Sequence, residues 1–374
     1  MNYQKRYWEL SQKFRQGEAC HIAETNMDIR LFEFESNRVG REPFGDDAAI
    51  TTSDCSIREN YSFTYPVFMR SEKKQQEQAI LLLHGLNERN WNKYLTWAEY
   101  LCHHTGKAVI LFPIAFHINR APLSWSNPRS LAHQLNFRRE QYRNDRSISF
   151  ANVALSNRIS EIPERFYLSG RQTWGDLSML FEQIKTGRHS LFKEATQIDI
   201  FAYSIGAFLS QITLMVNDKD LFSDSRLFMF CGGSIFRSMF GISRSIMDSA
   251  AFEKLQDYYL HIFGEEPHGK WEQDSAFHAF FSMISKDRMQ SERESRFTHL
   301  KERIRGVALA RDKVIPYHGI EEAFGKKNME RNIRLIDFPF PYTHENPFPL
   351  NTQEETAVNE AFDTVFSQAA GFLA

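Results

Sequence analysis

Cysteine is scarce in this sequence, and its cysteines stand far apart. The 374 residues contain four of them, and no two are spaced as a Cys-x-x-Cys pair. A disulfide framework uses many cysteines in a short chain, and a zinc site needs closely spaced ligands. We therefore expect reduced thiols at these positions, which are Cys20, Cys55, Cys102 and Cys231.

Long apolar runs are also missing. No stretch of the chain approaches the roughly 20 consecutive apolar residues that a membrane-spanning helix needs. Residues 1–9 carry charged and polar side chains where a secretory signal would have its apolar core. We therefore expect a soluble, cytoplasmic protein without stable membrane insertion.

An excess of charge of either sign is absent as well. The formal net charge is −2 and the sequence pI is about 6.7, so no overall basic field exists that would attract nucleic acid. The His-Glu-x-x-His pattern of zinc hydrolases and the glycine-rich phosphate loop are missing too. We predict a small-molecule substrate, no nucleic-acid partner, no cofactor and no metal.

Apolar residues are plentiful, and their pattern predicts the fold class. They make up 42% of the chain, which is enough to bury the core of one large domain. A buried strand at 79–83, an amphipathic helix at 91–101 and a strand at 108–112 follow one another. This order is typical of a crossover onto a parallel sheet, so we predict an α/β protein. Further strands are predicted at 29–34, 61–69, 198–202, 227–231, 307–310 and 333–336.

Two long segments interrupt this alternation within the predicted single domain 1–374. Residues 114–165 are rich in Arg, Asn and Ser, and we expect an irregular or helical insertion there. Residues 237–304 are expected to be mostly helical and to carry large aromatic side chains, which suggests a helical lid. The arginines between Arg120 and Arg171 either line a site for an acidic substrate group or form a solvated surface.

Ser204 is the candidate nucleophile. It stands in Ala202-Tyr203-Ser204-Ile205-Gly206, where a predicted strand ends and an amphipathic helix begins. A serine on such a sharp turn needs small residues two positions before and after it, and Ala202 and Gly206 satisfy this requirement. The alternative is an ordinary serine that caps the helix.

The segment His84-Gly85-Leu86 follows an earlier strand. Together with the turn at Ser204, it makes the chain resemble the α/β-hydrolase superfamily from about Ala79 to the C terminus. The resemblance implies the α/β-hydrolase fold, a mostly parallel central sheet flanked by helices, with helical lid insertions. It also implies that the backbone N–H groups of Leu86 and Ile205 form an oxyanion hole. Alternatively, His84-Gly85 is only a glycine-containing strand end.

The same resemblance points to the other two members of a catalytic triad. It places the acid after a late core strand, where Asp312 follows the strand at 307–310. The alternative is that Asp312 pairs with a neighbouring basic residue in solvent. Asp337 is the reserve candidate. The order serine, acid, histidine then requires a histidine after the last strand, which is His344, unless His344 is a surface residue of a proline-rich turn.

Ser204, Asp312 and His344 together predict a serine hydrolase. A serine hydroxyl attacks an acyl group only when an imidazole takes its proton and an acid orients that imidazole. We expect cleavage of an ester or a related acyl bond through an acyl-enzyme, as in esterases, lipases and thioesterases. The alternatives are an acyltransferase, in which an alcohol or amine intercepts the acyl-enzyme, and a binding protein that has kept the hydrolase fold without catalysis.

Overall fold

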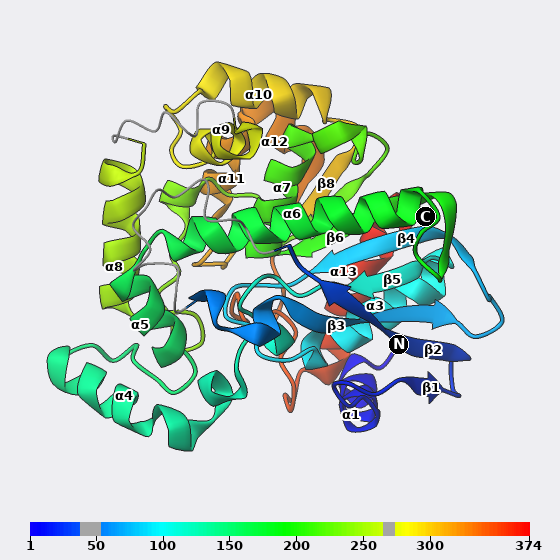
Figure 1. Ribbon diagram of the computed structural model, residues 1–374, viewed down its shortest axis with the longest axis horizontal. Helices are drawn as coiled ribbons and strands as arrows, with labels where there is room; N and C mark the ends of the chain where they lie inside the picture. Colours follow the sequence, from blue (N-terminus) through cyan, green and yellow to red (C-terminus); the bar gives the residue numbers. More distant parts are fainter. Residues whose placement is uncertain (38–53, 265–273) are drawn as a thin grey trace.

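A nine-stranded sheet forms the centre of the molecule (Figure 1). The computed structural model describes residues 1–37, 54–264 and 274–374. The strands lie in the order β1-β2-β3-β5-β4-β6-β7-β8-β9. Their bounds are β1 Cys20–Ile22, β2 Met27–Glu35, β3 Ser62–Arg70, β4 Gln76–Leu83, β5 Ala108–Leu111, β6 Phe192–Tyr203, β7 Leu227–Phe230, β8 Ile304–Leu309 and β9 Ile333–Ile336.

The sheet is antiparallel at one end and parallel over the rest. The neighbouring pairs β1/β2, β2/β3 and β3/β5 are antiparallel. The remaining pairs, β5/β4, β4/β6, β6/β7, β7/β8 and β8/β9, are parallel. The inner parallel strands β5 and β7 are short, fully buried apolar runs because both of their faces are covered, whereas Arg334 and Leu335 of the edge strand β9 are exposed. The predicted fold class, an α/β-hydrolase fold with a mostly parallel sheet flanked by helices, is confirmed.

Alternate side chains of the sheet face two separate cores. In β4, Ile80 and Leu82 pack into one core while Leu81 and Leu83 pack into the other, and all four are fully buried. Helices α1, α3 and α13 cover the first face, and helices α6 and α7 cover the second (Figure 1). Their bounds are α1 Tyr3–Lys13, α3 Asn92–Thr105, α6 Arg165–Lys185, α7 Ile205–Val216 and α13 Glu355–Leu373.

The remaining helices belong mostly to the two segments predicted as insertions. Figure 1 shows α4, α5 and α8 together at the left of the molecule, away from the two chain termini. The segment 237–304 contains α8, a π-helical turn, α9 and α10, and its residues 265–273 lie outside the described residues. The bounds are α4 Pro128–Gln141, α5 Val153–Glu161, α8 Ser249–Asp257, the π-helical turn Tyr258–Ile262, α9 Ser275–Ser282, α10 Gln290–His299, α11 Tyr317–Phe324 and α12 Lys326–Asn332.

The predicted strands all exist, but some boundaries and one helix differ. Strand β6 begins at Phe192, six residues before the predicted strand, and α1 was not predicted because its few apolar positions stand among polar residues. The sequence Thr352-Gln353-Glu354-Glu355 has the capping-box pattern and predicts a C-terminal helix that opens there; the helix exists, but Thr352 does not cap it. The Thr352 hydroxyl accepts a hydrogen bond from the N–H of Glu354 at 3.1 Å, which closes a local turn and delays the helix to Glu355.

Several simpler expectations concern thiols, metals and membranes. The four cysteines are free thiols, as predicted. Within the described part of the chain, no group of three or more His, Cys, Asp or Glu side chains is placed to hold a metal ion. None of the helices in residues 1–37, 54–264 and 274–374 has both the length and the apolar character needed to cross a bilayer.

Candidate active site

Ser204 occupies a strained turn between β6 and α7. Its backbone has φ 56° and ψ −121°, a conformation that a non-glycine residue adopts only when the surroundings impose it. Gly206 is needed beside it, because a Cβ there would lie 2.8 Å from the carbonyl oxygen of His84. The Ser204 side chain makes no hydrogen bond to the helix, so it does not serve as a capping serine.

Ser204, His344 and Asp312 form one chain of hydrogen bonds. The Ser204 Oγ lies 2.7 Å from Nε2 of His344, and Nδ1 of the same imidazole lies 2.8 Å from Oδ2 of Asp312. The other carboxylate oxygen of Asp312 accepts from the N–H groups of Val314 and Ile315, both at 2.9 Å. All three side chains are buried. This geometry lets the imidazole take the serine proton while the carboxylate fixes its orientation.

Asp312 and His344 are not the solvent-exposed side chains that the alternative interpretations expected. Asp312 is 5% exposed and makes no ion pair with Arg311 or Lys313, and His344 is 4% exposed. Arg311 instead contacts the reserve candidate Asp337, with 2.8 Å between Nε and Oδ1. Asp337 is exposed and therefore plays no part in the chain of hydrogen bonds at Ser204.

The loop that carries His344 is fastened from two sides. The hydroxyl of Tyr203 donates to the His344 carbonyl oxygen, and the two rings stack with centroids 5.4 Å apart. Lys93 donates to the carbonyl oxygen of Glu345 at 3.0 Å and lies over the Tyr203 ring. Burial raises the pKa of Tyr203 well above its ordinary value, so the phenol stays a hydrogen-bond donor.

The backbone amides of Leu86 and Ile205 are both available to a ligand. Among the described residues, the Leu86 N–H donates no hydrogen bond. Ile205 is the first residue of α7, where a helix leaves its amides without an intrahelical acceptor. Each follows the carboxyl end of one of two paired parallel strands, β4 and β6. Their position fits two donors for an oxyanion beside Ser204.

His84 has a structural role at the end of β4. Its Nε2 accepts the N–H of Ile114 at 2.9 Å, so Nδ1 carries the proton and donates to the carbonyl oxygen of Gly85 at 2.8 Å. Burial lowers the pKa of His84 well below its usual value, which keeps the ring neutral. Both ring nitrogens therefore hold backbone in place next to Leu86.

A polar cluster that the sequence did not reveal supports the same loop. The N–H of Gly85 donates to the Tyr94 hydroxyl at 3.0 Å, and that hydroxyl donates to the Glu88 carboxylate at 2.7 Å. Lys93 also donates to Glu88, at 2.6 Å. In the sequence, Tyr94 counts as one of the apolar positions of a helix, and the only available signal was its closeness to the His84-Gly85 segment.

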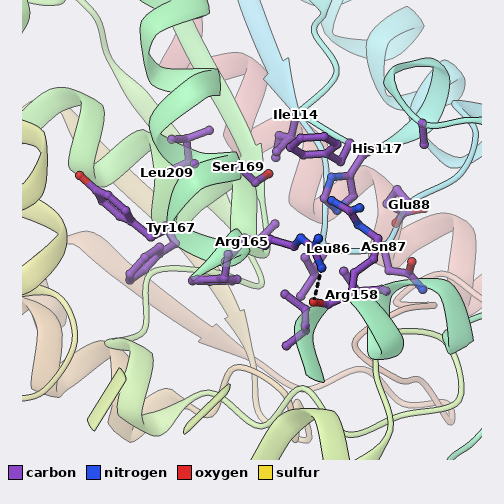
Figure 2. A pocket seen from close by; sticks show the side chains of 18 of the residues that line it. Leu86, Asn87, Glu88, Ile114, His117, Arg158, Arg165, Tyr167, Ser169 and Leu209 are labelled. Atoms are coloured by element: carbon purple, nitrogen blue, oxygen red, sulfur yellow. Dashed lines mark hydrogen bonds between the residues drawn. The ribbon is translucent and has the colours of Figure 1, made fainter. Parts of the chain in front are cut away.

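Two neighbouring cavities lie beside Ser204. One of them, called the polar cavity because mostly polar and charged residues line it, has Ser204 and His344 in its wall. The other, called the apolar cavity because its walls are mostly apolar, has Ile205 in its wall. Residues 86–89 border both. Figure 2 shows Leu86, Asn87 and Glu88 on one side of the apolar cavity and Tyr167, Ser169 and Leu209 on the opposite side. Further apolar walls come from Ile114, Leu155, Trp174, Phe208, Ile212 and Phe280.

Sequence comparison assigns the chain to a family without a known activity. The model of a family of unknown function (DUF6051) matches residues 1–374, so the chain belongs to that family. No curated protein sequence matches it significantly.

Several solved structures resemble this one at low sequence identity. A bacterial heroin esterase is 11% identical with a TM-score of 0.48, over 93% of this chain and 85% of the other. A hyperthermophilic esterase from the archaeon Pyrobaculum calidifontis is 10% identical with a TM-score of 0.44, over 98% and 90%. Carboxyl esterase 2 from the fungus Tuber melanosporum is 10% identical with a TM-score of 0.45, over 99% and 97%.

Proposed function

We propose that this member of the DUF6051 family is a serine hydrolase that cleaves an ester or a related acyl bond of a small molecule. The observation that carries the proposal is the unbroken chain of hydrogen bonds from Ser204 through His344 to Asp312. It lies beside Leu86 and Ile205, which both line the apolar cavity and whose backbone N–H groups donate no hydrogen bond among the described residues.

The proposed reaction begins with proton transfer within the triad. His344 takes the proton of Ser204 at Nε2 while the serine oxygen attacks the acyl carbon and forms a tetrahedral intermediate. Asp312 stabilises the resulting imidazolium through its hydrogen bond to Nδ1. No metal or cofactor takes part in this sequence of steps.

The negative charge that develops on the acyl oxygen needs fixed donors. The N–H groups of Leu86 and Ile205 supply them, and the amino-terminal end of α7 adds its positive dipole. Loss of one such donor typically slows an acyl transfer by about two to three orders of magnitude. The proton on His344 then passes to the leaving group, and water releases the acyl group from Ser204 by the reverse sequence.

The two insertions are proposed to cover the site. Helix α9 of the segment 237–304 packs against α7 and contributes Phe280 to the apolar cavity. The segment 114–165 contributes Trp125 and Leu155 to the same cavity. We propose the segment 237–304 as a lid because its helix α9 packs against α7, which begins at Ile205, and contributes Phe280 to the wall of the apolar cavity.

Ester hydrolysis by purified protein tests the proposal. The wild type is expected to hydrolyse nitrophenyl esters of short and medium acyl chains. The variant Ser204→Ala is expected to hydrolyse them no faster than the uncatalysed background reaction. The matched control is Ser295→Ala, a serine exposed on α10, which is expected to retain wild-type rates. Equal hydrolysis by wild type and Ser204→Ala contradicts the proposal.

Product analysis in the presence of an added alcohol separates hydrolysis from acyl transfer. The free acid is the expected product, and formation of a new ester as the main product identifies a transferase instead. Binding of ester without any turnover indicates the non-catalytic alternative.

A further inference from the structure

Arg89 is a half-buried cation without a carboxylate partner among the described residues. Its Nη2 donates to the carbonyl oxygens of Phe150, at 2.9 Å, and Ala151. Its other N–H groups have no acceptor in residues 1–37, 54–264 and 274–374. Burial alone lowers the pKa of Arg89, and no neighbouring acid offsets the effect. A guanidinium stays charged at neutral pH, so an unmatched positive charge remains at this place.

The other arginines near the site differ from Arg89 because each has an acid. Arg158 and Arg165 both contact Asp54, and Arg171 contacts Asp274, all at 2.8 or 2.9 Å. These three line the apolar cavity, and Arg165 also pairs with Glu161, so each of them has a carboxylate beside it. Figure 2 shows Arg158 and Arg165 next to each other at this cavity. Farther away, Arg120 pairs with Asp176 and Arg138 with Asp248. Among the described arginines that line the two cavities, Arg89 therefore lacks an acid partner, and it lies outside the arginine-rich segment that the sequence drew attention to.

The position of Arg89 relative to the scissile bond follows from the two cavities. His344 lines the polar cavity and must reach the leaving-group oxygen, so the leaving group occupies that cavity. Ile205 and its apolar neighbours line the other cavity, which suits the acyl chain. Arg89 borders both cavities, three residues after the proposed oxyanion donor Leu86. An anion bound there lies close to the ester, not at the far end of the substrate.

We propose that Arg89 binds a carboxylate of the substrate, so that the enzyme acts on esters carrying a carboxylate a few bonds from the scissile carbonyl. The inference rests on the proposed serine-hydrolase function. A guanidinium with free N–H groups pairs with carboxylates through charge-assisted hydrogen bonds, which are stronger than neutral ones. Partial burial strengthens the pairing further, because the cavity screens charge less than bulk water does.

Two pairs of esters test this proposal and distinguish the two sides of the ester. The first pair is the nitrophenyl hemiester of succinate and the nitrophenyl ester of butanoate, which differ by a carboxylate on the acyl side. The second pair is the butanoyl ester of glycolate and the butanoyl ester of the neutral methyl glycolate, which differ on the alcohol side. In the wild type, kcat/KM is expected to be about tenfold to a hundredfold higher for the anionic member of at least one pair.

The variant Arg89→Gln is expected to abolish that preference, and raised salt is expected to weaken it in the wild type. Arg143→Gln is the matched control. It removes the same charge from an exposed position outside both cavities and is expected to keep the wild-type ratio. A wild type that turns over both members of each pair equally overturns the proposal, whatever the variants do.

Direct binding separates failure of this inference from failure of the proposed function. Hexanoate titrated calorimetrically into Ser204→Ala is expected to bind, and the double variant Ser204→Ala, Arg89→Gln is expected to bind it at least tenfold more weakly. Equal affinity in the two proteins contradicts the role of Arg89. If hexanoate binding depends on Arg89 but no ester is hydrolysed, the carboxylate site stands and the hydrolase proposal fails.

Discussion

The ring of Tyr203 stacks on the imidazole of His344 at 5.4 Å between centroids, and its hydroxyl donates to the carbonyl oxygen of the same residue. Tyr203 directly precedes Ser204 in the chain. One residue of β6 therefore sets the position of the proposed base relative to the proposed nucleophile. This contact joins the turn at Ser204 to a loop more than a hundred residues away, where the Ser204 Oγ and the His344 Nε2 lie 2.7 Å apart.

The variant Tyr203→Phe tests this coupling. It removes one buried donor and keeps the ring, so the His344 loop loses a hydrogen bond and stability falls by about 1–3 kcal/mol. We expect kcat to fall by about tenfold, because the imidazole is held less firmly. Tyr65→Phe is the matched control, since the Tyr65 hydroxyl contacts His189 and neither residue lines either cavity. It is expected to lower stability without lowering kcat, and equal loss of kcat in both variants contradicts the coupling.

The strained turn predicts a severe effect of a single methyl group. In Gly206→Ala the new Cβ meets the His84 carbonyl oxygen at 2.8 Å and the Leu83 carbonyl carbon at 2.9 Å. Because both contacts are backbone atoms, the turn must shift, at a cost of about 1–3 kcal/mol. We expect a lower melting temperature and nearly complete loss of ester hydrolysis. Gly175→Ala, which adds its Cβ in open space on α6, is expected to keep activity and to melt at the same or a higher temperature.

Replacement of Asp312 and replacement of Asp337 are expected to have very different effects on kcat. Asp312→Asn leaves the shape of the site intact but no longer stabilises the imidazolium, and kcat is expected to fall by about three to four orders of magnitude, as in other triads. Asp337→Asn changes an exposed carboxylate that contacts Arg311, and it is expected to leave kcat within about twofold. Steady-state kinetics on a neutral ester measure both. A larger effect of Asp337→Asn reverses the assignment of the acid.

Acid is expected to destabilise the protein partly through His189. Burial lowers the pKa of His189 to about 4, whereas the pKa of a histidine in the unfolded chain is about 6.5. The unfolded state therefore takes up the proton first, so the free energy of unfolding is undiminished above about pH 6.5 and falls as the pH drops toward 4. His189→Gln is expected to flatten this dependence in urea unfolding, whereas His133→Gln, at an exposed position, is expected to leave it unchanged. An equally steep loss in His189→Gln contradicts the assignment.

The sequence predicted the buried strands and the turn at Ser204 well, because the backbone there allows only certain residue types. Apolar runs long enough for a buried strand predicted β4 to β9, and the small residues around Ser204 marked a turn that tolerates no Cβ at position 206. Asp312 was predicted from the resemblance to the α/β-hydrolase superfamily, and His344 from the order serine, acid, histidine along the chain. The structure brings both to Ser204, since the carboxyl ends of parallel strands lie at one edge of the sheet.

The sequence was least informative about contacts between distant segments. Tyr203 was predicted only as part of the turn, and Lys93 has no periodic signal, yet both hold the loop of His344. The apolar cavity is built from α5, α6, α7 and α9, so no local pattern reveals it. Arg158 differs from Arg89 in that it pairs with Asp54, and ion pairing of this kind depends on tertiary packing that the sequence does not show.

Labelling with a fluorophosphonate probe, followed by peptide mass spectrometry, tests the central claim most directly. Such probes phosphonylate a serine only when a neighbouring base and an oxyanion site activate it. The account predicts one adduct per chain, located on Ser204, that is absent in Ser204→Ala and strongly slowed in His344→Ala. No adduct on folded wild-type protein, or an adduct that persists at another serine when Ser204 is replaced, would contradict it.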